Sequence, residues 1–110
     1  MNRRRVIVYV SGKYTDKDRR SVEENVRIAK EYAQKIWEMG YTVICPHTNT
    51  DFIESSLVWK DYIEGDMELI KRSDIVFMLP NWKDSKGAKI EWNEAQDLGL
   101  RVVYNLEELV

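Results

Sequence analysis

Continuous apolar runs and amphipathic stripes alternate along the chain. The runs are short and rich in β-branched residues, as is typical of strands buried on both faces of a parallel sheet. The stripes repeat every three or four residues, which predicts helices. The predicted strands cover residues 6–10, 41–45, 74–79 and 101–104, and the predicted helices cover 21–39, 57–72 and 85–98. Residues 106–110 predict at most one helical turn.

Local signals set the ends of the predicted helices. Ser21 and Glu24 have the spacing of a capping box, so the first helix is expected to begin at Ser21. Ser85 is the expected N-cap of the third helix. Gly40 and Gly99 follow the first and third helices, and each can end its helix in the left-handed conformation that glycine adopts without strain.

Strands and helices alternate from the first predicted element to the last strand. This order predicts an α/β fold in which a parallel sheet carries helices on both faces, and it predicts one domain over residues 1–110. Ligands of such sheets bind at the carboxyl ends of the strands. The loops expected at those ends cover residues 11–16, 46–56 and 80–85, so we expect a site among them.

Composition narrows the classes of partner. The 110 residues include 17 basic and 19 acidic side chains, and this balance favours neither nucleic acid nor an anionic membrane. No apolar run approaches the about 18 residues of a membrane span. Cys45 is the only cysteine of the sequence, which excludes a disulfide framework and indicates a reducing, cytoplasmic location.

Common nucleotide and metal signatures are missing from the sequence. No G-x-G-x-x-G follows the first predicted strand, and no G-x-x-x-x-G-K-[ST] occurs in the chain. One histidine and one cysteine do not make a zinc site. We therefore expect no metal and no cofactor, and carboxylate chemistry is the best remaining candidate.

Two carboxylates are predicted to face inward on successive helices. Glu91 lies three residues after Ala88 and four before Ala95, on the apolar stripe of its helix. Asp66 has the same kind of position on the preceding helix. Burying a carboxylate is costly unless it is paired. Two interpretations stay open: both side chains reach solvent at the edge of the stripe, or together they form a site.

The second interpretation predicts chemistry at a sugar carbon. The helix start at Ser85 and Gly87 offers backbone N–H groups to an anion or a hydroxyl group. Glu91 could attack the sugar carbon, as the carboxylates of retaining glycosidases do. Asp66 could protonate the leaving base or activate water, and Tyr9 could hydrogen-bond Glu91.

Three motifs, in order and with matching spacing, resemble the nucleoside 2-deoxyribosyltransferase superfamily. They are Tyr9-Val10-Ser11-Gly12, then Glu64-Gly65-Asp66 with Asp74 eight residues later, then Ser85-x-Gly87-x-x-x-Glu91-x-x-x-Ala95. The similarity covers about residues 6–104. It is nearest to short, often phage-encoded members and to 2′-deoxynucleoside 5′-monophosphate N-glycosidases. It implies a flavodoxin/Rossmann-like parallel sheet of four to five strands and a homodimer or higher homo-oligomer.

The resemblance also implies roles for single residues. Glu91 matches the nucleophile that attacks C1′ of the sugar, Asp66 matches the aspartate that serves the base or leaving group, and Tyr9 matches the tyrosine that contacts the nucleophile. The candidate substrate-binding residues are Ser11, Gly12, Lys13, Tyr14, His47, Ser85 and Gly87. Tyr14 is either a base-stacking residue or a surface aromatic. For His47 a hydrogen-bonding role is favoured over that of a catalytic base.

Two ends of the substrate are distinguished by these residues. Ser85 and Gly87 match the turn that meets the 5′ end, and Gly12 matches the glycine beneath the base. Lys13, Ser11 and Ser85 supply groups that suit a phosphate, so the 5′-monophosphate is the favoured form of the substrate.

The sequence thus predicts an enzyme that cleaves or transfers the N-glycosidic bond of a (deoxy)nucleoside or nucleoside 5′-monophosphate, through a covalent glycosyl-Glu91 intermediate. It would be an N-glycosidase or a deoxyribosyltransferase. The alternative is a non-catalytic nucleotide-binding or sensing module of the same fold, which is favoured by Asn93 at a position where the family often has glycine. A third hypothesis is a structural or interaction protein.

Overall fold

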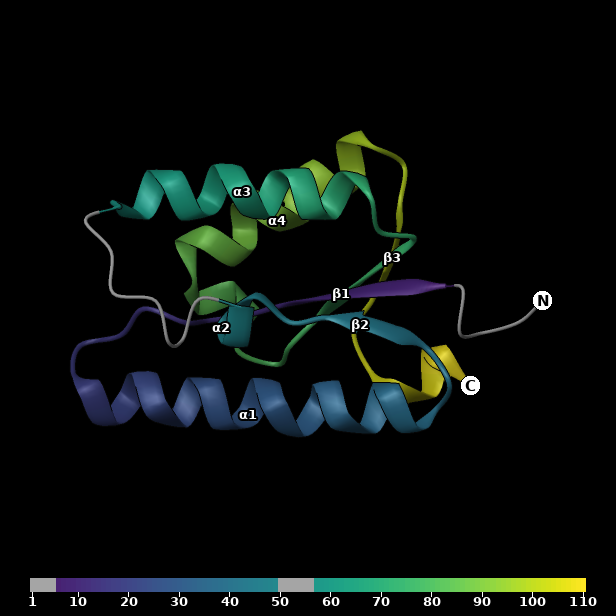
Figure 1. Ribbon diagram of the computed structural model, residues 1–110, viewed down its shortest axis with the longest axis horizontal. Helices are drawn as coiled ribbons and strands as arrows, with labels where there is room; N and C mark the ends of the chain where they lie inside the picture. The colour runs from purple at the N-terminus through teal and green to yellow at the C-terminus, as the bar shows by residue number, and fades with distance from the viewer. Residues whose placement is uncertain (1–5, 50–56) are drawn as a thin grey trace.

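Helices enclose a parallel sheet in the computed structural model, which describes residues 6–49 and 57–110 (Figure 1). The elements are β1 (Ile7–Ser11), α1 (Arg19–Glu38), β2 (Thr42–Ile44), α2 (Pro46–Asn49), α3 (Trp59–Lys71), β3 (Ile75–Met78), the 3₁₀ turn η2 (Trp82–Asp84), α4 (Lys86–Asp97), β4 (Arg101–Val103) and the 3₁₀ turn η3 (Leu106–Leu109). The described part of the chain has no helix that is both long and apolar enough to cross a membrane.

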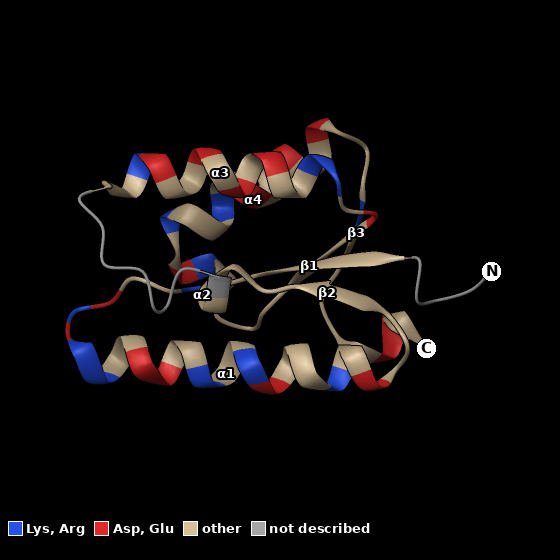
Figure 2. Ribbon diagram, viewed as in Figure 1, with Lys and Arg blue, Asp and Glu red and all other residues tan. Residues whose placement is uncertain are grey.

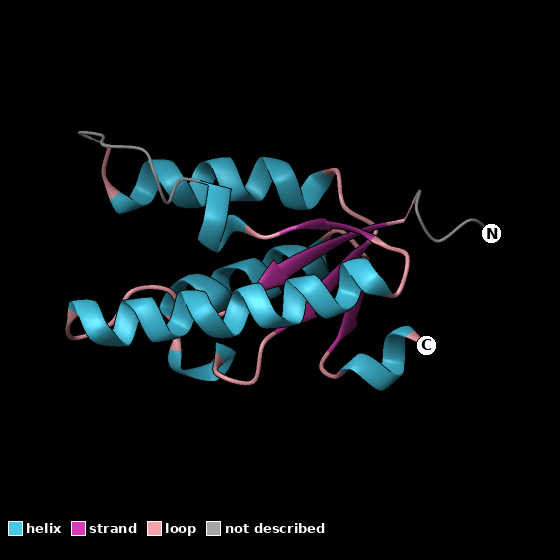
Figure 3. Cartoon of the chain, turned by 60° about the horizontal axis from the view of Figure 1, so that its bottom comes forward, coloured by secondary structure: helices cyan, strands magenta, loops and turns pink. Residues whose placement is uncertain are grey.

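The sheet has four parallel strands in the order β2-β1-β3-β4. Helix α1 covers one face, and α3 and α4 cover the other, so the strands lie between two helical layers (Figures 1 and 3). The predicted α/β class with a parallel sheet and helices on both faces is confirmed. β2 lies on one side of β1, and β3 lies on the other. The strand order therefore reverses beside β1. Ligand sites in open parallel sheets lie at such a point.

Strand β1 sends alternate side chains to the two faces, because successive residues of a strand point in opposite directions. Val8 and Val10 join the core beneath α1. Tyr9 joins the second core, between the sheet and the helices α3 and α4. Ser11 follows Tyr9 by two residues and therefore points to the same face. This alternation brings two hydroxyl groups toward α4.

The start of the first helix differs from the prediction. Asp18, not Ser21, is the N-cap: its backbone is extended, and its Oδ1 accepts a 2.8 Å hydrogen bond from the backbone N–H of Ser21. The predicted capping box of Ser21 and Glu24 is therefore wrong. Asp18, three residues earlier, accepts the N–H of Ser21, so the helix begins one turn sooner. The ends of the helices agree with the prediction, since Gly40 and Gly99 have φ of +98° and +70°.

The predicted loop 46–56 begins as a helix. Residues Pro46–Asn49 form the single turn α2, with proline at its first position, where its missing N–H is not needed. The rest of that predicted loop lies outside the described residues. Asp74 has a structural role: its Oδ2 accepts a 2.8 Å hydrogen bond from the N–H of Ile7, and its own N–H donates to the Ile7 carbonyl. These bonds join the starts of β1 and β3.

Most charged residues of the described chain belong to the helices, where basic and acidic residues are interspersed (Figure 2). Arg27 on α1, for example, forms ion pairs with Glu24 and Glu31, one turn before and one turn after it. Such exposed pairs contribute little to stability. The mixed signs agree with the near-neutral net charge of −2.

Gly65 lies inside α3 and is exposed, and a Cβ atom added to it would meet no atom within 4 Å. Glycine inside a helix costs about 1 kcal/mol relative to alanine. We therefore expect Gly65→Ala to raise the free energy of unfolding by about 1 kcal/mol, as measured by urea denaturation. Glu64→Ala, at the preceding exposed position of the same helix, is the control and should change it by less. A lower stability of Gly65→Ala would contradict the open space at this position.

Candidate active site

Glu91 is the centre of the candidate site, at the end of β1 where the strand order reverses. It lies on α4, which begins after the N-cap Ser85; the Oγ of Ser85 accepts a 3.1 Å hydrogen bond from the N–H of Ala88. The side chain of Glu91 is buried, with 6% of its surface exposed. The inward direction predicted from the stripe is therefore observed, and the alternative in which Glu91 reaches solvent is wrong.

Both carboxylate oxygens of Glu91 accept a hydrogen bond from β1. The hydroxyl of Tyr9 donates to Oε2 at 3.0 Å, and the Oγ of Ser11 donates to Oε1 at 2.6 Å. Tyr9 and Ser11 are fully buried. Burial and the charge of Glu91 raise the pKa of Tyr9 well above its usual value, so its hydroxyl stays a donor. The rotamer of Glu91 is held at both oxygens, and the bond that we expected from Tyr9 is present.

Asp66 faces this cluster from α3. It is partly buried, and it interacts with both Glu91 and Tyr9. Burial raises the pKa of Asp66 to about 6, and the neighbouring side chains of Glu91 and Tyr9 oppose this shift. Burial also raises the pKa of Glu91 to about 8; the hydrogen bond from Ser11 opposes this shift, and the charge of Asp66 adds to it.

The two carboxyl groups therefore hold a proton together near neutral pH. Ionising both would place two like charges side by side in a poorly hydrated site, which is costly. One group can then act as an acid while the other acts as a carboxylate, which is the division of labour that glycosidic-bond enzymes require. Groups with strongly shifted pKa values cluster at functional sites, although structural pairs also shift them.

Gly12 follows Ser11 at the end of β1 and packs against Leu79. A Cβ atom at position 12 would lie 2.5 Å from Cδ1 of Leu79, so no side chain fits there. The N–H of Leu79 also donates a 2.8 Å hydrogen bond to the carbonyl of Ser11, which continues the pairing of β1 with β3. At Gly87, in the first turn of α4, a Cβ atom would make only ordinary contacts, the nearest with Ile63 at 3.5 Å.

Of the other predicted substrate-binding residues, Ser11 contacts the carboxylate, whereas Lys13, Tyr14 and His47 lie in or against the loop after β1. The hydroxyl of Ser11 donates its hydrogen to the carboxylate of Glu91. Lys13 and Tyr14 lie in the loop after β1, where the Nζ of Lys13 is 3.5 Å from Oδ2 of Asp16. His47 is buried on α2, and its Nε2 bonds the carbonyl of Lys13 at 3.0 Å, so the predicted hydrogen-bonding role is observed.

Sequence reasoning missed Asn25 and Asn81, which bond the loop after β1. Asn81 accepts a 3.0 Å hydrogen bond from the N–H of Lys13, and Asn25 donates one of 3.2 Å to the carbonyl of Tyr14. Asn81 directly follows the proline that ends the third predicted strand, and a polar residue at a carboxyl end was the signal available for it. Asn25 lies three residues after Val22 and four before Ala29, so a polar residue on an apolar stripe was the signal available for it.

A surface cavity opens beside the site at the end of β3. Its volume is about 470 Å³, and it is lined by Met78, Leu79, Pro80, Trp82, Lys83 and Tyr104. The ring of Trp82 stacks on Trp92, with centroids 5.7 Å apart. No group of three or more His, Cys, Asp or Glu side chains that could hold a metal ion occurs within residues 6–49 and 57–110.

The chain belongs to the family DUF4406, a domain of unknown function, whose model matches residues 6–104. Its fold is similar to that of a solved 2-deoxyribosyltransferase from the psychrotolerant bacterium Bacillus psychrosaccharolyticus, described as a biocatalyst for the synthesis of antiviral and antitumoral nucleosides. The two share 22% identity with a TM-score of 0.68, over 88% of this chain and 69% of that one. This likeness shows a nucleoside 2-deoxyribosyltransferase-like fold. No curated protein matches the sequence.

Proposed function

We propose that the protein cleaves or transfers the N-glycosidic bond of a (deoxy)nucleoside or nucleoside 5′-monophosphate. The observation that carries the proposal is the buried Glu91, held at both oxygens by hydroxyl groups and facing a second carboxyl group at Asp66. Within residues 6–49 and 57–110, no basic side chain forms an ion pair with either carboxyl group. The fold and the place of the pair at the sheet's carboxyl edge support the same reading.

The proposed reaction has two steps at C1′ of the sugar. The proton of the pair, which the pKa values place mainly on Glu91, first passes to Asp66. An oxygen of the ionised Glu91 attacks C1′, the C1′–N bond breaks, and its electron pair on the base nitrogen takes the proton from Asp66. A water molecule or a second base then attacks C1′, its proton passes to Asp66, and the bond to Glu91 breaks. Water gives hydrolysis, and a second base gives transfer.

The substrate is proposed to lie between the start of α4 and the loop after β1. The N-terminus of α4, at Ser85 and Gly87, suits the 5′ end, because its free N–H groups attract an anion. Lys13 can add a positive charge, although Asp16 already pairs with it. The base would then lie near Gly12 and Tyr14. We place the protein in the cytoplasm as a homodimer or higher homo-oligomer that acts as one domain; light scattering tests the oligomeric state.

A panel assay tests this function. The protein is incubated with deoxynucleosides, ribonucleosides and their 5′-monophosphates, with and without an added second base, and the free base is measured by chromatography. We expect free base from at least one compound, and a new nucleoside with the added base if the enzyme is a transferase. Release from none of them would contradict the proposed enzyme.

The second candidate is a nucleotide-binding module without turnover. It is favoured by the state of Glu91, because a carboxyl whose pKa is raised to about 8 is largely protonated at neutral pH and is then a poor nucleophile. This module would bind a nucleotide and raise the melting temperature, with no base released. The thermal shift therefore separates the two functions in the same panel.

A further inference from the structure

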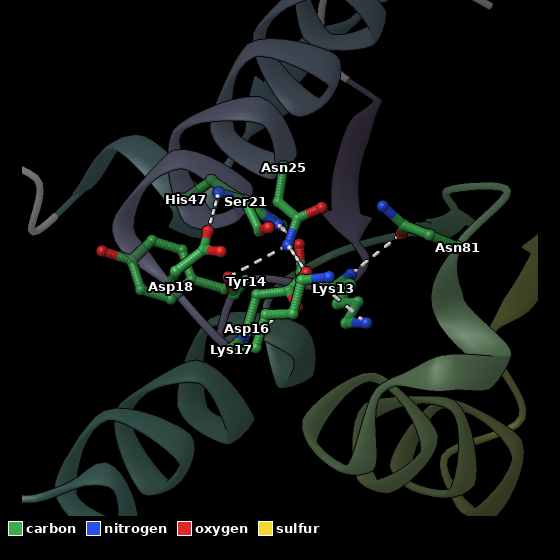
Figure 4. Close-up of polar contacts among 9 residues, drawn as sticks. All are labelled: Lys13, Tyr14, Asp16, Lys17, Asp18, Ser21, Asn25, His47 and Asn81. Atoms are coloured by element: carbon green, nitrogen blue, oxygen red, sulfur yellow. Dashed lines mark hydrogen bonds and ion pairs between the residues drawn. The ribbon is translucent and has the colours of Figure 1, made fainter.

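We propose that Asn81 and His47 are positioning residues that clamp the peptide of Lys13, so that the segment Lys13–Tyr14 is a preformed wall of the substrate site. The inference rests on the proposed function, because the wall is useful only if a nucleoside or nucleotide lies against it. Figure 4 shows the side chains of the clamp converging on this segment from different elements.

Both polar groups of the Lys13 backbone are bonded by side chains. The N–H donates to Oδ1 of Asn81 at 3.0 Å, and the carbonyl is 3.0 Å from Nε2 of His47. Asn81 comes from the segment between β3 and η2, and His47 comes from α2. Asn81 and His47 are 34 residues apart in sequence, so the clamp joins distant parts of the chain at one residue, Lys13.

His47 is suited to this task by its burial. A carbonyl can only accept, so Nε2 carries the hydrogen and Nδ1 is the bare nitrogen of the neutral ring. Its Nδ1 is buried and has no hydrogen-bond partner among the described residues, and 5% of the side chain is exposed. Burial lowers the pKa of His47, which keeps the ring neutral. The ring also meets that of Tyr14 edge-on, with centroids 5.9 Å apart.

Further bonds secure the residues after Lys13. The buried Asn25 of α1 donates to the carbonyl of Tyr14 at 3.2 Å and to Oδ2 of Asp16 at 3.1 Å. Asp16 pairs in turn with the ammonium of Lys13. The loop therefore needs little ordering when a ligand binds, which is the general advantage of a preorganised site.

The clamp lies close to the residues that hold Glu91, so we expect it to affect substrate binding. Lys13 and Tyr14 come directly after Gly12 and Ser11, and Ser11 holds Glu91. A fixed wall that contacts the substrate away from the reacting atoms binds it equally well before and during the reaction. Loosening such a wall raises KM and leaves kcat nearly unchanged.

Substitutions that remove one bond at a time test the clamp. Asn81→Ala removes the acceptor, whereas Asn81→Asp keeps an oxygen at the same place. His47→Phe removes the donor, whereas His47→Gln offers an N–H near the position of Nε2. Asn105→Ala is the matched control, because Asn105 also bonds a single backbone N–H, in η3, away from the site.

We expect Asn81→Ala and His47→Phe to raise KM for the best substrate of the panel about tenfold, while kcat stays within about threefold. Asn81→Asp and His47→Gln should recover part of the loss, and Asn105→Ala should match the wild type. Amide hydrogen exchange at Lys13, measured by NMR, should be faster in Asn81→Ala. Folded variants with faster exchange but an unchanged KM would overturn the clamp as a positioning device.

A wild type that releases no base makes the proposed enzyme fail, and the clamp is then judged by dissociation constants for the 5′-monophosphates. Weaker binding by Asn81→Ala and His47→Phe, with the control unchanged, supports the clamp. Equal binding by all variants, or no binding by the wild type, overturns it.

Discussion

Glu91→Gln is expected to lower the rate of base release by at least about 10³-fold, because the amide cannot form the glycosyl ester that splits the reaction into two steps. Glutamine keeps the size of the side chain and one oxygen that can accept from Tyr9 or Ser11. The loss therefore reports the missing carboxylate rather than a collapsed site. The rate is measured by chromatography of the free base with the best compound of the panel.

Asp97→Asn is the control for this change, since it replaces an exposed carboxylate by an amide on the same helix. It should keep the wild-type rate. Asp66→Asn should also lower the rate by orders of magnitude, because it removes the proposed acid and base. A Glu91→Gln protein that keeps more than about a tenth of the wild-type rate would remove Glu91 from the role of nucleophile.

The sequence was enough to predict the strands and long helices, because each has a hydrophobic pattern of its own. The apolar run at the first strand and the stripe around Ala88 and Ala95 are local signals, and the inward direction of Glu91 follows from the second of them. The stripe of the preceding helix likewise predicts an inward Asp66, and the family resemblance matches Glu91, Asp66 and Tyr9 to family roles. Each of these predictions needs only the sequence pattern of a single helix or strand.

The parts that could not be predicted depend on contacts between distant elements. The hydrogen bond from Ser11 to Glu91 joins residues 80 positions apart, and it forms because β1 and α4 pack together. Asn81 bonds Lys13, 68 residues away, and no local pattern predicts that pairing. The start of α1 was misplaced for a related reason: Ser21 and Asp18 are both good caps, and only the backbone path selects Asp18.

The free energy of unfolding is expected to depend on pH through Glu91. Burial raises the pKa of this carboxyl to about 8 from the usual 4.5, so the folded protein keeps a proton that the unfolded chain has lost between these values. Stability contributed by this group therefore falls as the pH rises from 4.5 to 8. Glu91→Gln has no proton to lose and removes this dependence.

We therefore expect Glu91→Gln to be more stable than the wild type by roughly 2–4 kcal/mol at pH 8 and by close to nothing at pH 4.5. Urea denaturation of both proteins across this range measures the difference. His47, whose pKa is lowered by burial, makes stability rise with pH near its own titration, but it is present in both proteins and cancels. A difference that stays constant with pH would mean that burial does not hold the proton on Glu91.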